Sequence, residues 1–132
     1  MNRIESAIKE QRAFFLLGEG LINSEIASEL NARNIPSFSL SDDIVDGIQE
    51  CTAENLAPAF SGNAILVLVE PSFAESKIND LLSIVQQGNP RPQIFLVTKS
   101  YNRFALPMRM MTWKMNQIKQ SGLPFVKNLP VF

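Results

Sequence analysis

The fold is decided by the stretch AFFLLGEG, residues 13–20, in which five apolar residues run into a turn of glycine, glutamate and glycine. A continuous apolar run of this length is typical of a strand that is buried on both faces of a parallel sheet. The run AILVLV at 64–69 has the same character and gives the strongest strand prediction in the chain. Further strands are predicted at 37–40, 93–97 and 125–126.

Segments with helical periodicity lie between these strands. The predicted helices open at residue 4, at Asn23 or Ser24, at Ser41, at Ser72 and at Pro107, the last one ending at Gly122. Alternation of buried strands with amphipathic helices predicts a single α/β domain over residues 1–132. The expected architecture has three layers, with a mainly parallel five-stranded sheet in a doubly wound, flavodoxin-like order.

Composition removes several functional classes. The chain has no histidine, which excludes Ser-His-Asp and Cys-His nucleophiles and histidine-based zinc sites. Its one cysteine, Cys51, excludes an internal disulfide and is expected to be a small core residue on a helix. The first residues carry no signal-peptide pattern and the run at 64–69 is too short to span a membrane, so the cytoplasm is the expected location. No metal, cofactor or catalytic residue is predicted.

The charge of the chain is unevenly distributed along its length. All 13 acidic residues and five of the basic ones lie at or before Asp80, so this part carries a net charge of −8. The remainder has seven basic residues and no acidic one. Two interpretations stay open: the basic part forms a binding surface, for which nucleic acid is one candidate, or the two parts neutralise each other across the fold.

Polar residues follow four of the predicted strands. In a doubly wound sheet, ligands bind beyond the carboxyl ends of the strands, where these residues would form a ligand rim. The rim consists of Glu19, Glu70, Thr98 and Lys127. Two carboxylates, a hydroxyl and an amine could hold a hard cation or a phosphate. The competing interpretation is that polar residues simply gather where strands end.

The same four segments resemble a response-regulator receiver domain. Glu19 in AFFLLGEGLI stands in the turn where that family has paired magnesium-binding acids, and Glu70 in LVLVEP stands at the phosphoacceptor aspartate. Thr98 in IFLVTK and Lys127 in FVKNLP match the family's conserved hydroxyl residue and lysine. The resemblance implies a five-stranded sheet in receiver-like order. With glutamate in place of the acceptor, it also implies a pseudo-receiver, a non-enzymatic protein-interaction or regulatory module without phosphotransfer.

Other functions are left as alternatives. One is a small phospholigand- or nucleotide-binding domain or enzyme that uses the strand ends, although Gly18-Glu19-Gly20 lacks the third glycine of a dinucleotide-binding turn. Residues 70–76 also resemble the strand-to-helix junction of TIR domains, but the following residues lack the glutamate of the NAD-cleaving members.

The segment YNRFALPMRMMTWKMNQIKQ, residues 101–120, is basic and rich in methionine. On a helix, its methionines at 108, 111 and 115 form one stripe, which is expected to face the core. The opposite side forms a predicted interaction surface of Arg109, Trp113, Lys114, Asn116 and Gln120. Arginine and tryptophan are the residues that most often dominate binding energy, so a protein partner or a second copy of the chain is expected there. Nucleic acid and burial of Trp113 against the body are the alternatives.

Overall fold

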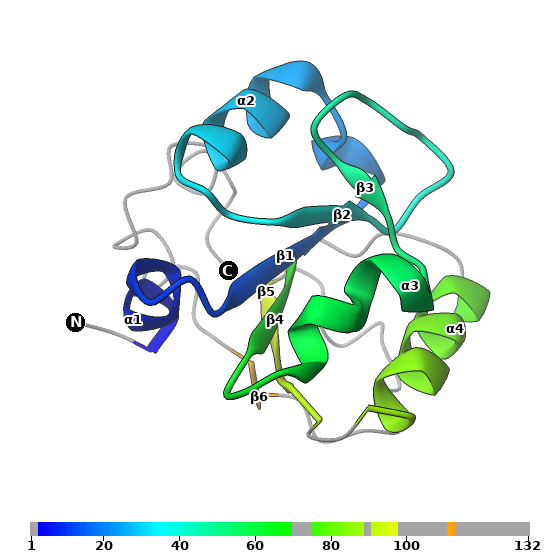
Figure 1. Cartoon of the computed structure of the whole chain (residues 1–132). Helices are drawn as coiled ribbons and strands as arrows, with labels where there is room; N and C mark the ends of the chain where they lie inside the picture. The colour runs from blue at the N-terminus through cyan, green and yellow to red at the C-terminus, as the bar shows by residue number, and fades with distance from the viewer. Residues whose placement is uncertain (1–2, 70–74, 89–90, 98–110, 113–132) are drawn as a thin grey trace.

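The backbone forms one parallel sheet with helices on both sides (Figure 1). The computed structural model describes residues 3–69, 75–88, 91–97 and 111–112. Its strands are β1 (Ala13–Leu17), β2 (Ser37–Ser39), β3 (Gln49–Glu50), β4 (Ile65–Val69), β5 (Gln93–Val97) and β6 (Met111–Thr112). They are arranged in the order β3-β2-β1-β4-β5-β6, and every pairing is parallel.

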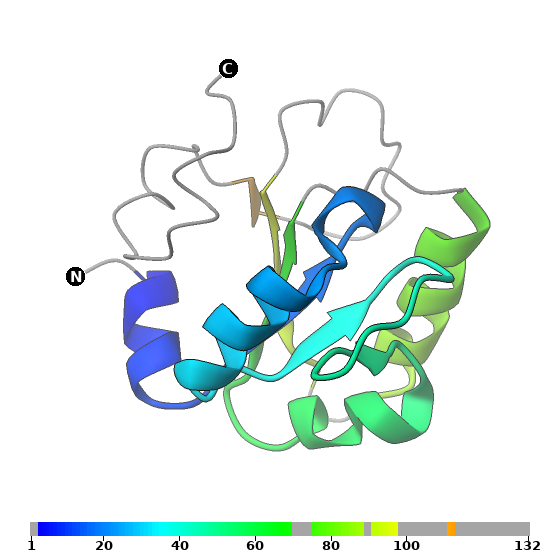
Figure 2. The same cartoon turned by 90° about the horizontal axis from the view of Figure 1, so that it is seen from above.

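The helices cover the two faces of this sheet in separate groups (Figure 2). They are α1 (Arg3–Lys9), η1 (Glu19–Leu21), α2 (Ser24–Ala32), α3 (Ala53–Leu56), η2 (Ala57–Phe60) and α4 (Glu75–Gln86). Side chains of α1 and α2 pack on one face, and side chains of α3, η2 and α4 pack on the other. The predicted three-layer α/β architecture is therefore confirmed.

Alternate residues of β1 supply both halves of the core. Phe15 and Leu17 pack with Leu30 of α2, whereas Phe14 and Leu16 pack on the opposite face. The second face is completed by Leu56, Leu66, Leu68, Leu81 and Val85. Because successive side chains of a strand point to opposite faces, a strand covered on both sides must be apolar throughout. This explains the unbroken apolar run that predicted the fold.

The helix predicted to begin at Ser41 is wrong. The segment is instead a loop that leads into the short edge strand β3. Gly47 has a φ of +94°, which is outside the helical region. Ile44, which a helix from Ser41 was expected to turn toward the core, is 63% exposed, whereas Ile48 is buried. Cys51 is half-buried between β3 and α3, so it is not on a helix.

The sheet also differs from the prediction at its two edges. The unpredicted strand β3 extends it on one side, and Met111–Thr112 forms β6 where a helix over 107–122 was predicted. With β3 included the strands follow the order of dinucleotide-binding folds, and without it they follow the flavodoxin-like order. The strand predicted at 125–126 lies outside the described residues.

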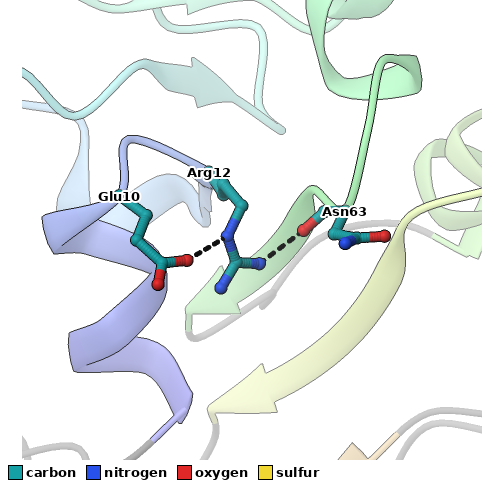
Figure 3. A network of polar contacts seen from close by, with 3 residues as sticks. All are labelled: Glu10, Arg12 and Asn63. Carbon is teal, nitrogen blue, oxygen red and sulfur yellow. Dashed lines mark hydrogen bonds and ion pairs between the residues drawn. The ribbon is translucent and has the colours of Figure 1, made fainter.

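One side chain ties the amino-terminal ends of β1 and β4 together (Figure 3). Arg12, just before β1, donates from Nη1 to the backbone carbonyl oxygen of Asn63 at 2.5 Å and from Nε to Glu10 at 2.6 Å. The carbonyl of Arg12 in turn accepts from the N–H of Ile65 at 2.9 Å. This junction lies at the end of the sheet opposite to the strand ends where ligands bind in such folds.

The outer edge of β3 is partly closed by its own chain. The carbonyl oxygen of Glu50 accepts from the N–H of Thr52 and from the side-chain amide of Asn55, each at 3.0 Å. Thr52 is also the N-cap of α3, because its hydroxyl oxygen accepts from the N–H of Asn55 at 3.1 Å. The edge strand and the short helix after it are thus held as one unit.

Candidate functional site

The strand order reverses between β1 and β4, where parallel sheets usually bind their ligands. The two strands run in register, with Leu17 opposite Val69. The N–H of Gly18 continues the ladder by donating to the carbonyl oxygen of Val69 at 3.0 Å. The turn after β1 therefore lies beside the end of β4, the strand that Glu70 follows in the sequence.

Glu19 is the first residue beyond this ladder. It opens the short 3-10 helix η1 and its side chain is exposed, whereas the preceding Gly18 is buried. The helix α2 that follows is capped by Asn23, whose side-chain oxygen accepts from the N–H of Ile26 at 2.9 Å. Asn23 was one of the two predicted caps. In phosphate-binding folds, the turn after the first strand presents free backbone N–H groups to the anion. Here the turn carries the carboxylate of Glu19, and the N–H of Ile26 is already bonded to the side chain of Asn23.

The other predicted site residues lie outside the part of the chain that the structure describes. In the ligand rim these are Glu70, Thr98 and Lys127, so Glu19 is the rim residue whose position is described. In the interaction surface they are Arg109, Trp113, Lys114, Asn116 and Gln120. Both groups stay predictions. The strand at Met111–Thr112 interrupts the helix on which the spacing of the second group was based.

A pocket that the sequence did not predict lies at the carboxyl ends of β2 and β3. Its volume is about 210 Å³, and it is bounded by the loop after β2, the segment that follows β3 and the middle of α4. The first residues of the loop between β2 and β3 therefore lie close to the middle of α4. The lining residues are Ser39, Leu40, Ser41, Asp42, Glu50, Cys51, Thr52, Asp80 and Leu81.

The described lining of the pocket includes two core leucines and three acids. Leu40 and Leu81 belong to the core and are 3% and 1% exposed. Asp42, Glu50 and Asp80 are exposed acids, and the described residues that line the pocket include no lysine or arginine. Among the described residues, no group of three or more acids or cysteines is placed to hold a metal ion. The three carboxyl groups therefore surround the pocket without converging on one point.

The hydroxyl groups of the pocket fix the loop that carries Asp42. Ser39 is 3% exposed, and its Oγ lies 2.9 Å from the carbonyl oxygen of Asp43, to which it donates. Ser39 Oγ also accepts a hydrogen bond from the N–H of Ser41 at 3.1 Å. Ser41 Oγ in turn accepts from the N–H of Asp43 at 3.0 Å. These bonds give the loop a defined backbone path although it contains no helix or strand.

The sequence contains signals for this loop that also match the start of a helix. Ser41, Asp42 and Asp43 match an N-cap followed by acidic residues, but the same residues favour turns. Asp46-Gly47 is a turn dipeptide. Taken together, these residues could have predicted a loop at the edge of the sheet, although not its contact with α4.

Comparisons of the chain with models of known protein families, with curated proteins and with solved structures found no match. In the described part of the chain, no helix combines the length and the apolar composition that crossing a membrane requires.

Proposed function

We propose that this chain is a non-enzymatic protein-interaction or regulatory module, built on a receiver-like scaffold that does not carry out phosphotransfer. The observation that carries the proposal is the turn between β1 and α2, where Glu19 is exposed and Asn23 caps the helix. In a phosphate-binding domain of this topology, that turn supplies free backbone N–H groups to the anion. Here the turn bears a negative charge, which opposes direct binding of a nucleotide phosphate. The lack of phosphotransfer is inferred from the resemblance to receiver domains, in which Glu70 stands at the phosphoacceptor aspartate.

The expected contact surface for the partner is the basic segment with Arg109 and Trp113. Basic and aromatic side chains together supply charge steering and a binding anchor. The partner is a protein or a second copy of the chain, and the expected location is the cytoplasm. Nucleic acid is a weaker candidate, because the net charge of the whole chain is −1 and its isoelectric point is about 5.4.

The second candidate function is binding of a nucleotide or another phospholigand at the strand ends. The order β3-β2-β1-β4-β5-β6 favours it, since this is the arrangement of dinucleotide-binding domains. Glu19 weighs against it, because a carboxylate in the phosphate turn opposes the ligand's charge. Fold alone does not determine function, so the strand order by itself does not make this chain a nucleotide-binding domain. The charge in the turn favours the interaction module.

The proposal is tested first with small phosphorylated ligands. Calorimetric titration with Mg²⁺, ATP, NAD and acetyl phosphate is expected to give no saturable heat, and mass spectrometry no added phosphoryl group. Saturable heat or a phosphorylated residue would contradict the proposal. The variant Glu19→Ser removes the opposing charge and should gain weak ATP binding. Glu54→Gln, which removes an exposed acid on α3, is the control that should gain none.

The second test addresses the partner directly. The chain is immobilised and exposed to an extract of cells that express it naturally, and the captured proteins are identified and then purified. Binding of the purified partner should be lost in the Arg109→Ala/Trp113→Ala variant and kept in Lys9→Ala, which changes an exposed residue of α1. Equal binding of the partner by the unchanged chain, the double variant and Lys9→Ala would contradict the prediction that Arg109 and Trp113 form the contact surface.

A further inference from the structure

We infer that the Asp46–Gly47 peptide is a modification site, at which the aspartate converts to isoaspartate through a cyclic imide. The dipeptide lies in the loop between β2 and β3, and both of its residues are exposed. Aspartate followed by glycine reacts most readily in this way, because glycine has no β-carbon to hinder ring closure and its backbone rotates freely. This site is independent of the proposed function.

The reaction needs only the chain and water. The backbone nitrogen of Gly47 attacks Cγ of Asp46 in its carboxylic acid form, so that an N–Cγ bond forms and a Cγ–O bond breaks. The hydroxyl oxygen leaves as water, with its own proton and the proton of the Gly47 N–H. Water then opens the five-membered ring at one of its two carbonyl carbons. Opening at Cγ restores aspartate, whereas opening at the main-chain carbon leaves the chain running through Cβ and Cγ, which is isoaspartate.

Both reacting groups are free of competing contacts in the part of the chain that the structure describes. The N–H of Gly47 donates no hydrogen bond there, and the carboxylate of Asp46 has neither a hydrogen bond nor an ion pair. A group that is already bonded must give up its partner before it reacts, which adds to the barrier. Neither Asp46 nor Gly47 has this cost.

The turn around this peptide controls how often the two groups can meet. Residues 45–48 form a turn that is closed by the N–H of Ile48, which donates to the carbonyl oxygen of Val45 at 3.2 Å. Gly47 has a φ of +94° at the third position, as in a type II turn. This geometry directs the nitrogen of Gly47 away from Cγ of Asp46, so the peptide plane must rotate before the ring can close.

The contacts that resist this rotation are weak. The carbonyl oxygen of Gly47 accepts from Asn31 Nδ2 and from Ser37 Oγ, each at 3.4 Å. Both distances are longer than is usual for such hydrogen bonds, and the contact with Asn31 is exposed to water. The peptide can therefore rotate without unfolding of the sheet, and loss of the Asn31 contact should let it rotate more often.

Isomerisation changes the edge of the sheet and not its centre. Isoaspartate adds one atom to the main chain just before Ile48, which is 4% exposed, and before the strand β3. The carbonyl of Gly47 then no longer fits its contacts with Asn31 and Ser37. Since β3 pairs with β2 through only two residues, it is the element expected to loosen.

The test ages the full chain at neutral pH and follows its aspartates by peptide mass spectrometry. Isoaspartate has the mass of aspartate but separates from it in chromatography, and electron-transfer fragmentation distinguishes the two. We expect isoaspartate at residue 46, with an intermediate that is one water lighter. Asp42, Asp43 and Asp80 precede larger residues and should form none. Absence of isoaspartate at residue 46, or equal amounts at the other three positions, would overturn the inference.

Asp46→Glu is the matched variant, because it keeps the charge but must close a larger ring, and it should give no product. Gly47→Ala is unsuitable, since a β-carbon at this φ would overlap the Asn31 side chain. Asn31→Ala should form isoaspartate several-fold faster than the unchanged chain, whereas Ser28→Ala, at another exposed position of α2, should not. Circular dichroism before ageing reports whether each variant is folded. An unchanged rate in Asn31→Ala would contradict the inferred control by the turn.

Discussion

Arg12 and Asn63 are joined by a hydrogen bond of 2.5 Å between the guanidinium Nη1 and the backbone carbonyl oxygen, across 51 positions of the chain. We predict that Arg12→Ala lowers the free energy of unfolding by about 1–2 kcal/mol, because a backbone carbonyl loses a charged donor. Urea unfolding followed by circular dichroism measures the change. The contact lies at the junction before β1 and β4, so the loss of stability is expected without a change in the fold.

The ion pair with Glu10 is expected to contribute little to this effect. The side chains of Arg12 and Glu10 are 32% and 59% exposed, and exposed ion pairs are worth about 0–1 kcal/mol. Glu10→Gln should therefore cost less than Arg12→Ala in the same measurement. If the two variants were equally unstable, the ion pair rather than the Asn63 contact would hold the junction.

Gly88 follows α4 at a point where the ring of Phe60 leaves no room for a side chain. A β-carbon on Gly88 would overlap the Phe60 ring. Gly88→Ala is thus expected to destabilise the fold by about 1–3 kcal/mol, since the ring must move out of its packed position. Gly20→Ala is the control, because a β-carbon there meets nothing within 4 Å. Combining Gly88→Ala with Phe60→Leu should recover part of the loss.

Ser39 is predicted to control the order of the loop that carries Asp42 and Ile44. Its hydroxyl accepts from the N–H of Ser41 and donates to the carbonyl of Asp43, so Ser39→Ala leaves both backbone groups without this partner. We expect a loss of about 1–3 kcal/mol in stability. Hydrogen exchange should also become faster in residues 41–47 than elsewhere. Uniformly faster exchange would show that the hydroxyl stabilises the whole fold and not this loop.

Glu29 on α2 carries a buried carboxylate oxygen, Oε1, that has no hydrogen-bond partner among the described residues. Methionine has a similar unbranched shape and a similar helix propensity, and it removes the cost of burying a polar atom. Glu29→Met is therefore predicted to raise the free energy of unfolding by about 1 kcal/mol. The control is Glu25→Met, at an exposed position of the same helix, where no gain is expected. A loss of stability in Glu29→Met would mean that the carboxylate has a favourable contact.

The central strands could be predicted from the sequence because burial on both faces leaves a simple pattern. The runs at 13–17 and 65–69 are apolar throughout, and each ends at the predicted residue. The Asn23 cap is confirmed as well, and Leu81 and Val85 of α4 lie in the core at helical spacing. In these elements, local preference and tertiary packing favour the same structure.

The edges of the sheet could not be predicted in this way, because tertiary contacts decide them. Ser41 looks like a helix cap, but its hydroxyl bonds to the N–H two residues later and forms a turn, and Gly47 prevents a continuous helix. Met111 fits a helical stripe, yet it pairs with Phe95 in a strand. Methionine fits many environments, so a stripe of it is weak evidence for a helix.

The pocket was missed because its walls are far apart in the sequence. Asp42 and Glu50 are separated by a loop of irregular backbone, and Asp80 belongs to α4, which follows β4 in the sequence. No spacing rule links such residues. By contrast, the position of Glu19 at the end of β1 followed directly from the strand that precedes it.

The two hydrogen bonds that the carbonyl oxygen of Glu50 accepts affect how other molecules can bind to the edge of the sheet. An exposed edge strand normally offers its backbone to any extended peptide, which leads both to strand addition and to aggregation. Here Thr52 and Asn55 already occupy the acceptor that an incoming strand would need, and β3 is only two residues long. A molecule that binds at the β3 edge must therefore be recognised through its side chains and not through its backbone. Recognition there depends on the partner's sequence, and addition of further copies of the chain into fibres is limited.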